Sequence, residues 1–589
     1  MKNISRLFYF VTVVMISFSC SKEEANNIPK KEVDPKVSGY SVEEAMAENV
    51  KDHDEPGDAD FSESDVVEIT LKAASIAVEQ GKGADVSDNV VTINSAGTYR
   101  LSGKINDGRV IVNVSKDELV RIIMNNADIT CLNGAPMFIA ACKKTIIILA
   151  DGTENYLADH SSYIFDLPEE KEPNAALFSK DDMTICGTGK LTVTGKFNDA
   201  IGGKDGLVIK DAHLSLFAVD DGIQVKDYVV IKGDAVLDIR ALDDGIKSFH
   251  ETDPARGYTY IQSGVLNIIA GGDGIQAETQ ILVSNGTFDI VAGTGSDFNN
   301  VDNLSLKGLK SVTGVIIDDG NFVIDAADDA INSDGIISIN GGDFTLSSGD
   351  DALHADVALG ISGGNINILT CTGGLEGNII TIKGGIMNVV ATVDGINILD
   401  EKESDSQQST RKLKSGIEGE KSHLYIHGGH LYITALDDGI DVNGTFEMTG
   451  GEVVVNGKVG GDKAFEINGD MIISGGVLIA TQEAVMEPLP LELSKQHSLM
   501  VGFSAVHSAG TLFHIQKKSG DELLTFSPSQ KYQSVFISTP SFVEDEAYKI
   551  FYGGFSTGSM SHGIYKDGIY SPGDFFSEFT ASKVVTHIQ

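Results

Sequence analysis

Apolar and polar residues alternate in short segments that recur along most of the chain, and glycine pairs separate these segments. Examples are the segments 335–346 and 359–368, each of which contains a Gly-Gly pair. Alternation with a period of two is typical of β-strands, and a glycine pair forms a tight corner because glycine tolerates positive φ. Helix-period segments of useful length do not occur between these strands. The pattern therefore predicts an all-β protein.

A corner motif, Asp-Asp-Gly-Ile, divides the strands into repeats. Complete copies stand at 220–223, 243–246 and 437–440, and looser copies stand at 198–201, 272–275, 328–331, 350–353 and 393–396. Remnants of the motif stand at 308–309, 374–375, 416–417 and 463–465. Most steps between successive corners are 21 to 25 residues long, and such a period indicates a solenoid. Three strands and two corners per repeat predict a right-handed parallel β-helix. Two longer steps, of 29 and 34 residues, predict protruding loops near 250–258 and 293–303.

The repeat pattern sets the expected domain boundaries. We expect the β-helix over residues 65–485. Residues 486–589 lose the repeat and gain aromatic residues. Because the end of a solenoid exposes an unpaired strand edge, this region is predicted to form a β-rich C-terminal cap.

The first twenty residues have the features of a targeting segment. Lys2 and Arg6 precede an apolar run at 7–18 that is too short to span a bilayer stably. The segment ends at Cys20 and resembles a bacterial lipoprotein signal peptide, so Cys20 is the expected lipidation site. The acidic Ser21–Glu24 resembles the export signal of surface-exposed lipoproteins of the Bacteroidetes. We therefore expect an outer-membrane lipoprotein exposed at the cell surface; ordinary secretion with an incidental Cys20 is the alternative.

Charge and composition narrow the choice of partners. The chain has 44 Lys and Arg against 85 Asp and Glu, a formal net charge of −41, which excludes nucleic acid and anionic lipid surfaces as direct partners. Residues 21–64 are acidic and poor in aromatic residues, as in a flexible tether. Four further cysteines, at 131, 142, 186 and 371, lack zinc or disulfide spacing and are read as small buried residues. A disulfide between Cys131 and Cys142 is the alternative for two of them.

The repeated corner places carboxylates in a column. Neighbouring coils are about 4.8 Å apart, and two carboxylates at that distance repel by roughly 1 kcal/mol in water and about 3–4 kcal/mol at an effective dielectric constant of 20. Ca²⁺ suits such a column because it accepts six to eight oxygen ligands in flexible geometry. The alternative is a row of solvated turn residues. The predicted metal ligands are Asp220, Asp221, Asp243, Asp244, Asp273, Asp328, Asp329, Asp350, Asp351, Asp437, Asp438 and Asp441.

The loop that follows the corner at 243–246 is the predicted ligand site. It carries His250, Arg256, Tyr258 and Tyr260, and Lys247 lies at its start. An arginine can pair a uronate carboxylate with two hydrogen bonds, and tyrosines can stack on sugar rings. A second group, His423, His427 and His430, is a weaker candidate for a transition-metal site.

The repeated corners, the Ile-x-Gly-Gly-x-Ile segments and the pair 174–182 and 198–201 resemble one family. It comprises calcium-binding, carbohydrate-binding parallel β-helix proteins of bacterial cell surfaces, akin to family-nine pectate lyases. The resemblance covers about residues 65–585 and implies binding of an acidic polysaccharide such as polygalacturonate, with calcium between coils. The lyases hold their catalytic calcium with aspartates on consecutive coils and use a lysine as base. Here the third residue after Asp244 is Lys247, where those enzymes have an acid.

Three functions follow from these features. The leading hypothesis is calcium-dependent, non-catalytic binding of acidic polysaccharide by a monomer, anchored to the membrane through Cys20. The absence of tryptophan favours a charged ligand over cellulose, since flat neutral chains usually bind on aromatic platforms. The alternatives are a calcium-dependent polysaccharide lyase of the same fold and a structural surface protein or adhesin that calcium only stiffens.

Overall fold

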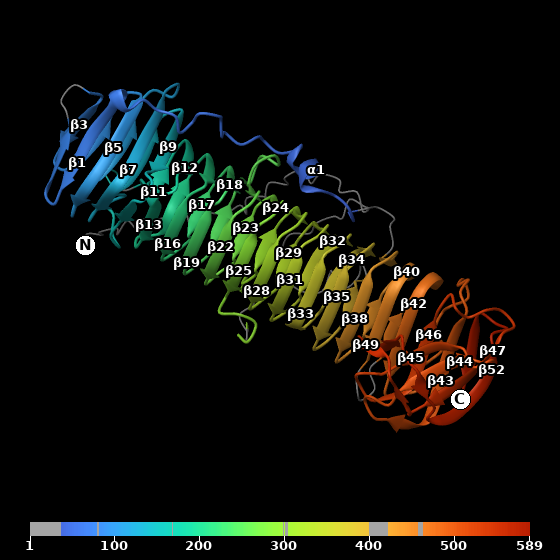
Figure 1. The fold of residues 1–589 in the computed structure, drawn as a ribbon. Coiled ribbons are helices and arrows are strands. Elements are labelled where there is room, and N and C mark those ends of the chain that lie inside the picture. Colours follow the sequence, from blue (N-terminus) through green and yellow to red (C-terminus); the bar gives the residue numbers. More distant parts are fainter. Residues whose placement is uncertain are drawn as a thin grey trace, which may run out of the picture.

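Three long parallel sheets run the length of the solenoid and enclose one apolar core (Figure 1). The structure is a computed structural model that describes residues 37–78, 82–165, 167, 169–298, 300, 304–399, 422–457 and 463–589. Each coil contributes one strand to each sheet, and each strand pairs in parallel with its equivalents on the neighbouring coils. The prediction of an all-β parallel β-helix is confirmed.

The first sheet follows the Asp-Asp-Gly corners, and we call it the corner sheet. Its strands are β4 (Val90–Ile93), β6 (Arg109–Asn113), β8 (Met137–Ala141), β11 (Ala175–Ser179), β14 (Asp199–Gly203), β17 (Ile223–Val225), β20 (Ile246–Ser248), β23 (Ile275–Ala277), β26 (Leu309–Ser311), β29 (Ile331–Ser333), the first parts of β32 (Leu353–Ile361) and β34 (Leu375–Ile382), β36 (Ile396–Ile398), β39 (Ile440–Val442) and β41 (Phe465–Ile467).

The second sheet is covered by an N-terminal segment, and we call it the strap sheet. Its strands are β1 (Val66–Lys72), β5 (Gly97–Ile105), β7 (Leu119–Thr130), β9 (Lys144–Leu149), β12 (Asp182–Cys186), β15 (Gly206–Lys210), β18 (Tyr228–Lys232), β21 (Tyr258–Ile261), β24 (Gln280–Val283), β27 (Gly314–Ile317), β30 (Ile336–Ile339), the last parts of β32 and β34, β37 (His423–Ile426), and the first parts of β40 (Thr445–Asn456) and β42 (Met471–Gln482).

The third sheet, the open sheet, is formed by the last strand of each coil. Its strands are the last parts of β5 and β7, β10 (Glu154–Ala158), β13 (Lys190–Gly195), β16 (His213–Ala218), β19 (Val236–Ala241), β22 (Val265–Ala270), β25 (Thr287–Ala292), β28 (Asn321–Ala326), β31 (Asp343–Ser348), β33 (Asn365–Cys371), β35 (Ile386–Ala391), β38 (His430–Ala435) and the last parts of β40 and β42. Two short strands at the front, β2 (Ser75–Val78) and β3 (Ala84–Ser87), pair antiparallel with β1 and β4.

The core repeats from coil to coil because the strands stay in register. Phe288, Phe322 and Phe344 stack with ring centroids 4.4 and 4.6 Å apart and their planes 2° from parallel. The glycine of the corner motif is required by close approach of the coils: a Cβ on Gly222 would lie 2.6 Å from the carbonyl oxygen of Gly245. The Gly-Gly corners need glycine for its conformation, as Gly342 has a φ of +99°.

The C-terminal region closes the last coil. The strand β46 (Tyr532–Ser538) pairs antiparallel with β42 and with β43 (Ser498–His507), which also pairs with β53 (Val585–Ile588). A separate six-stranded sheet contains β49 (Ser559–Ser561), β50 (Ile564–Lys566), β45 (Glu522–Phe526), β44 (Phe513–Lys517), β47 (Ala547–Tyr552) and β52 (Asp574–Thr580), and a two-stranded one contains β48 (Phe555–Ser556) and β51 (Tyr570–Ser571).

Residues 37–58, which we call the strap, lie along the strap sheet and differ from the flexible tether predicted there. Their one-turn helix α1 (Val42–Met46) packs on β24 and β27, as Figure 1 shows, and a 3-10 turn (Glu63–Asp65) precedes β1. His53 hydrogen-bonds Thr184 and Tyr228, at 2.9 Å each. The acidity and the few aromatic residues suggested a tether, but Val42 and Ala45 pack on the sheet as buried residues and Asp58 pairs with the buried Lys144.

The prediction of lipidation at Cys20 falls on residues 1–36, which lie outside the described part of the chain, together with the predicted signal peptide. Within the described residues, no helix has the length and apolar character needed to cross a membrane.

Candidate carboxylate site

The second acid of each corner motif belongs to a column that runs from coil to coil, which we call the aspartate ladder. Its members are Asp199, Asp221, Asp244, Asp273, Asp329, Asp351, Asp394 and Asp438. The backbone N–H of Asp244 donates to the carboxylate of Asp221 at 2.9 Å, and the N–H of Asp273 donates to that of Asp244 at 2.8 Å. Equivalent bonds join Asp351 to Asp329 and Asp438 to Asp394. One oxygen of each of these carboxylates therefore satisfies a backbone donor of the next coil.

The ladder is buried at most positions, so its acids are not solvated turn residues. Asp221, Asp273 and Asp329 are each 1% exposed, and Asp199 is fully buried. A buried carboxylate is stable only when it is hydrogen-bonded and its charge is compensated. The question for each coil is therefore which cation compensates the second oxygen.

The first acid of several corners joins the ladder acids in tight groups. Carboxylate oxygens within 4.8 Å of one another form four such groups in the described residues: Asp199, Asp220 and Asp221; Asp221, Asp243 and Asp244; Asp328, Asp329 and Asp350; and Asp394, Asp437 and Asp438. The structure thus brings together most of the predicted ligands. Asp394 takes the place predicted for Asp441, which lies on β39.

Lysines already neutralise part of the column. Lys247 Nζ lies 2.6 Å from a carboxylate oxygen of Asp244, and Lys310 Nζ lies 3.2 Å from one of Asp273. Lys307, which stands where other coils have the ladder aspartate, lies 2.5 Å from Asp329. The sequence signal for this arrangement was a lysine that recurs three residues after the ladder position. Lys247 and Lys310 occupy equivalent positions on β20 and β26.

The first group lacks such a partner at its buried acid. Asp199 accepts hydrogen bonds from the side-chain amides of Asn174 at 3.0 Å and Asn198 at 3.1 Å and from the backbone N–H of Asp221. Among the described residues, no basic side chain forms an ion pair with it. Burial, with the charges of Asp221 and Asp220 beside it, raises the pKa of Asp199 to about 8. Burial also raises the pKa of Asp221 to about 7, although Lys247 opposes the shift.

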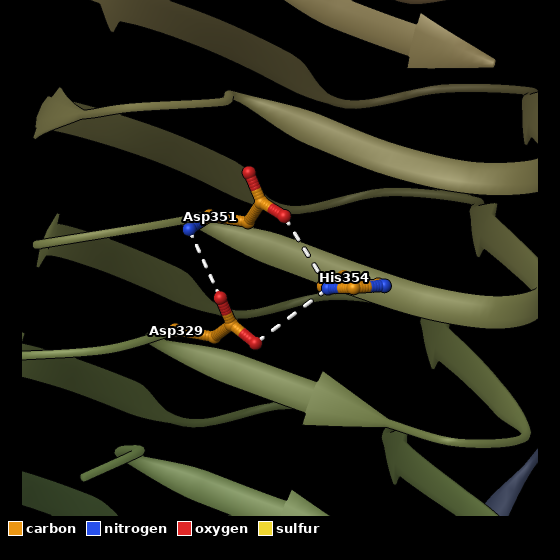
Figure 2. A group of neighbouring side chains, drawn as sticks. All are labelled: Asp329, Asp351 and His354. Atoms are coloured by element: carbon orange, nitrogen blue, oxygen red, sulfur yellow. Dashed lines mark hydrogen bonds and ion pairs between the residues drawn. The ribbon is translucent and has the colours of Figure 1, made fainter. Parts of the chain in front are cut away.

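A middle coil contains an imidazole instead, which the sequence analysis did not single out. Figure 2 shows His354 between the carboxylates of Asp329 and Asp351, with its Nδ1 3.6 and 3.3 Å from them. Its Nε2 lies 3.3 Å from Asp356 and 3.7 Å from Glu376. Burial alone would lower the pKa of His354, but these carboxylates raise it well above its usual value. An imidazolium and Lys307 therefore serve as the cations of this coil.

The predicted ligand loop is not assembled as expected. Arg256 pairs with Asp227 and Asp253. Tyr258 is fully buried, and its hydroxyl donates to the carbonyl of Val50 in the strap at 2.7 Å. The chain turns into the strap sheet after β20, so Tyr258 and Tyr260 lie on β21, away from the Asp243–Asp244 corner.

The remaining predicted residues are dispersed. His250 Nε2 lies 3.6 Å from Asp227, and Tyr260 shares a hydrogen bond with Ser284. Only Lys247 of the predicted ligand residues contacts the ladder. His423 stacks on Tyr425, and the three histidines at 423, 427 and 430 form no metal-binding group within the described residues. Cys131, Cys142, Cys186 and Cys371 are buried free thiols, so the Cys131–Cys142 bridge is absent.

A family match and a relative of this chain carry the same description. Residues 87–352 match the family described as "Carbohydrate-binding domain-containing protein". A protein of that description from Acetivibrio thermocellus is 35% identical over 211 residues, which cover 36% of this chain and 73% of that protein. Among solved structures, the polysaccharide lyase-like protein from C. thermocellum, a gadolinium derivative, is 29% identical, covers 43% of this chain and 96% of that one, and gives a TM-score of 0.38.

Proposed function

The chain belongs to the family of carbohydrate-binding domain-containing proteins, and on that premise we propose that it binds an acidic polysaccharide through calcium ions held by the aspartate ladder. The polysaccharide is polygalacturonate-like, and binding takes place at the outer surface of the cell. Family membership supports the carbohydrate ligand. The carboxylate geometry supports the cation.

The group of Asp199, Asp220 and Asp221 carries the proposal. Its oxygens converge within 4.8 Å, and Asp199 has only amide donors around it. Without a cation, the raised pKa of Asp199 means that this carboxyl would hold a proton near neutral pH. A hard divalent cation with flexible coordination, such as Ca²⁺, would replace that proton and bind all three acids.

The charge of the protein explains why a cation is needed for this ligand. A chain with a net charge of −41 repels a polyuronate. Asp220 is half-buried and Asp243 is exposed, so an ion bound by these groups would reach the surface of the corner. It could then take ligand carboxylates into its remaining coordination positions and bridge the two polyanions.

Binding is favoured over lyase chemistry by the state of Lys247. A lyase would need this lysine as a neutral base. Burial lowers the pKa of Lys247, but Asp244 and Asp221 outweigh burial and raise it above its usual range. The lysine is therefore a structural cation, and wild-type protein should release no unsaturated, ultraviolet-absorbing product from polygalacturonate.

Affinity electrophoresis in gels that contain polygalacturonate tests the proposal. Retardation should require calcium and disappear with chelator. Asp220→Asn together with Asp221→Asn should abolish it, whereas Asp350→Asn, in the coil that has its own cations, should not. Retardation that persists in excess chelator, or that the double variant keeps, would contradict calcium bridging.

Localisation rests on Cys20, which we propose to be acylated. Cys20→Ala should move the protein from the membrane fraction to the soluble fraction. A variant that stays with the membranes would exclude the lipid anchor.

A further inference from the structure

The outer face of the open sheet has a groove that is separate from the aspartate ladder. It has a volume of about 490 Å³ and lies across β28, β31, β33 and β35. Two columns of side chains line it. Asn321, Asp343 and Asn365 lie opposite one another in the first column, and Thr345, Asn367 and Asn388 do so in the second. We call it the amide groove.

The asparagine side chains of the groove have unused hydrogen-bonding capacity. Within the described residues, no group donates to or accepts from the side chains of Asn365, Asn367 or Asn388. Asn267, on the same sheet and in the same column three coils before Thr345, differs: its amide donates to Asp238 at 2.7 Å. If the groove asparagines only stabilised the fold, their side-chain amides would form hydrogen bonds from coil to coil in the same way. The groove amides are therefore free to bind something outside the chain.

The floor of the groove is rigid. Phe322 and Phe344 lie beneath it, in the stack that continues to Phe288. Their rings are buried, and they hold the strands of these coils in register. The two polar columns are thus fixed at the spacing of the coils, without the need for a ligand to order them.

The spacing and chemistry fit an extended sugar chain. Coils repeat about every 4.8 Å, which is close to the length of one pyranose ring, so a chain along the solenoid axis meets an equivalent side chain at each ring. Each side-chain amide has two N–H donors and one carbonyl acceptor, and sugar hydroxyls require both kinds of partner. Val323 and Ile386, 51% and 43% exposed, provide apolar contacts for the C–H faces of the rings.

The charge of the groove selects against uronates. Asp343 is the acid of the lining, and the lining contains no basic residue. We therefore propose that the amide groove binds an uncharged, extended polysaccharide without a metal ion. The inference rests on the carbohydrate binding proposed above but not on its calcium. Figure 1 shows α1 on the side of β24, away from β28, β31 and β33, so the strap leaves this face uncovered.

Affinity electrophoresis with three soluble neutral chains tests this site: methyl-esterified homogalacturonan, xyloglucan and galactomannan, all in the presence of chelator. At least one should retard the wild-type protein. Asn367→Ala combined with Asn388→Ala should lower the affinity measured from that retardation on the order of tenfold, since the hydrogen bonds of two side chains are lost. Asn267→Ala, an amide of the same column outside the groove, is the matched control and should bind as wild type does.

The outcomes separate this site from the aspartate ladder. Asp220→Asn with Asp221→Asn should keep neutral-chain binding, and the groove variant should keep calcium-dependent binding of polygalacturonate. If no neutral chain is retarded, or if the groove variant binds as well as Asn267→Ala does, the amide groove is not a glycan site, whatever the result with polygalacturonate. Thermal unfolding of each variant shows whether a loss of binding reflects a loss of fold.

Discussion

Two parts of the aspartate ladder share the corner motif but differ in how the charge of their buried carboxylates is compensated. At Asp199–Asp221, buried carboxylates face one another with amides as neighbours, and the pKa of Asp199 is raised to about 8. At Asp329–Asp351, His354 lies between the two carboxylates and Lys307 pairs with Asp329, so the pKa of Asp329 stays below its usual range despite full burial. The motif alone therefore does not define a metal site. The residues at the ladder position and three positions after it decide whether the chain supplies its own cation; where it does not, we propose that calcium does.

The largest effect is expected from removing an internal cation. Lys307→Met removes the lysine that pairs with the half-buried Asp328 and the buried Asp329, so that His354 remains as the cation beside Asp329. Breaking a buried ion pair costs roughly 3–5 kcal/mol. Chemical denaturation should show a fall in the free energy of unfolding of that order, partly restored by calcium. Lys104→Met, which removes an exposed partner of Asp128, is the control and should have little effect. If the two variants are equally stable, Lys307 is not the counter-ion of this coil.

Calcium should have the second-largest effect, and it should act on the first group. A ligand that binds only the folded state stabilises it by about 2.7 kcal/mol at a hundred times its dissociation constant. Calcium should therefore raise the melting temperature of wild-type protein and magnesium should raise it less, since magnesium demands strict octahedral geometry.

The same experiment on variants locates the ion. Asp220→Asn with Asp221→Asn should lose the calcium response, whereas Asp350→Asn should keep it. A response that vanishes with Asp350→Asn but survives the first pair would reverse the assignment of the two regions.

The third prediction uses pH. Asp199 and Asp221 have folded-state pKa values of about 8 and about 7, above the value of about 3.9 for an unfolded aspartate. The folded state therefore binds more protons than the unfolded state between about pH 4 and pH 8, so stability falls as the pH rises through this window. In chelator the slope should reach up to about 1.4 kcal/mol per pH unit for each group.

Two comparisons check the origin of that slope. Asp199→Asn should reduce it, and calcium should flatten it by replacing the protons. Asp289→Asn, an exposed position on the open sheet, should change nothing. A slope that Asp199→Asn leaves intact would place the titrating groups elsewhere in the molecule.

The repeat and the alternation were sufficient to predict the fold, because burial of every second side chain and glycine at close corners are local requirements. The carboxylate groups were largely predictable too, since equal spacing along the chain places Asp220 and Asp243 on adjacent coils. The loop residues were not: nothing local in Arg256 or Tyr258 shows that the chain turns into a sheet covered by residues 37–58. His354 was missed because its role depends on Asp329, which belongs to the previous coil.

The smallest effect is expected from substituting Lys247, whose surroundings are intermediate between those of the two ladder regions. It neutralises Asp244 at 2.6 Å and reaches Asp221 at a distance of 3.9 Å, so the first group is only partly supplied with an internal cation. Lys247→Ala removes the partly buried ion pair with Asp244 and leaves Asp244 free to join the calcium ligands. Retention on polygalacturonate should therefore change by no more than about fivefold in either direction, while the calcium response of the melting temperature should increase. Ultraviolet assays of wild type and variant should both be silent. Lyase turnover in the wild type that disappears in Lys247→Ala would show that this lysine is a base and that the first region of the ladder is a catalytic centre.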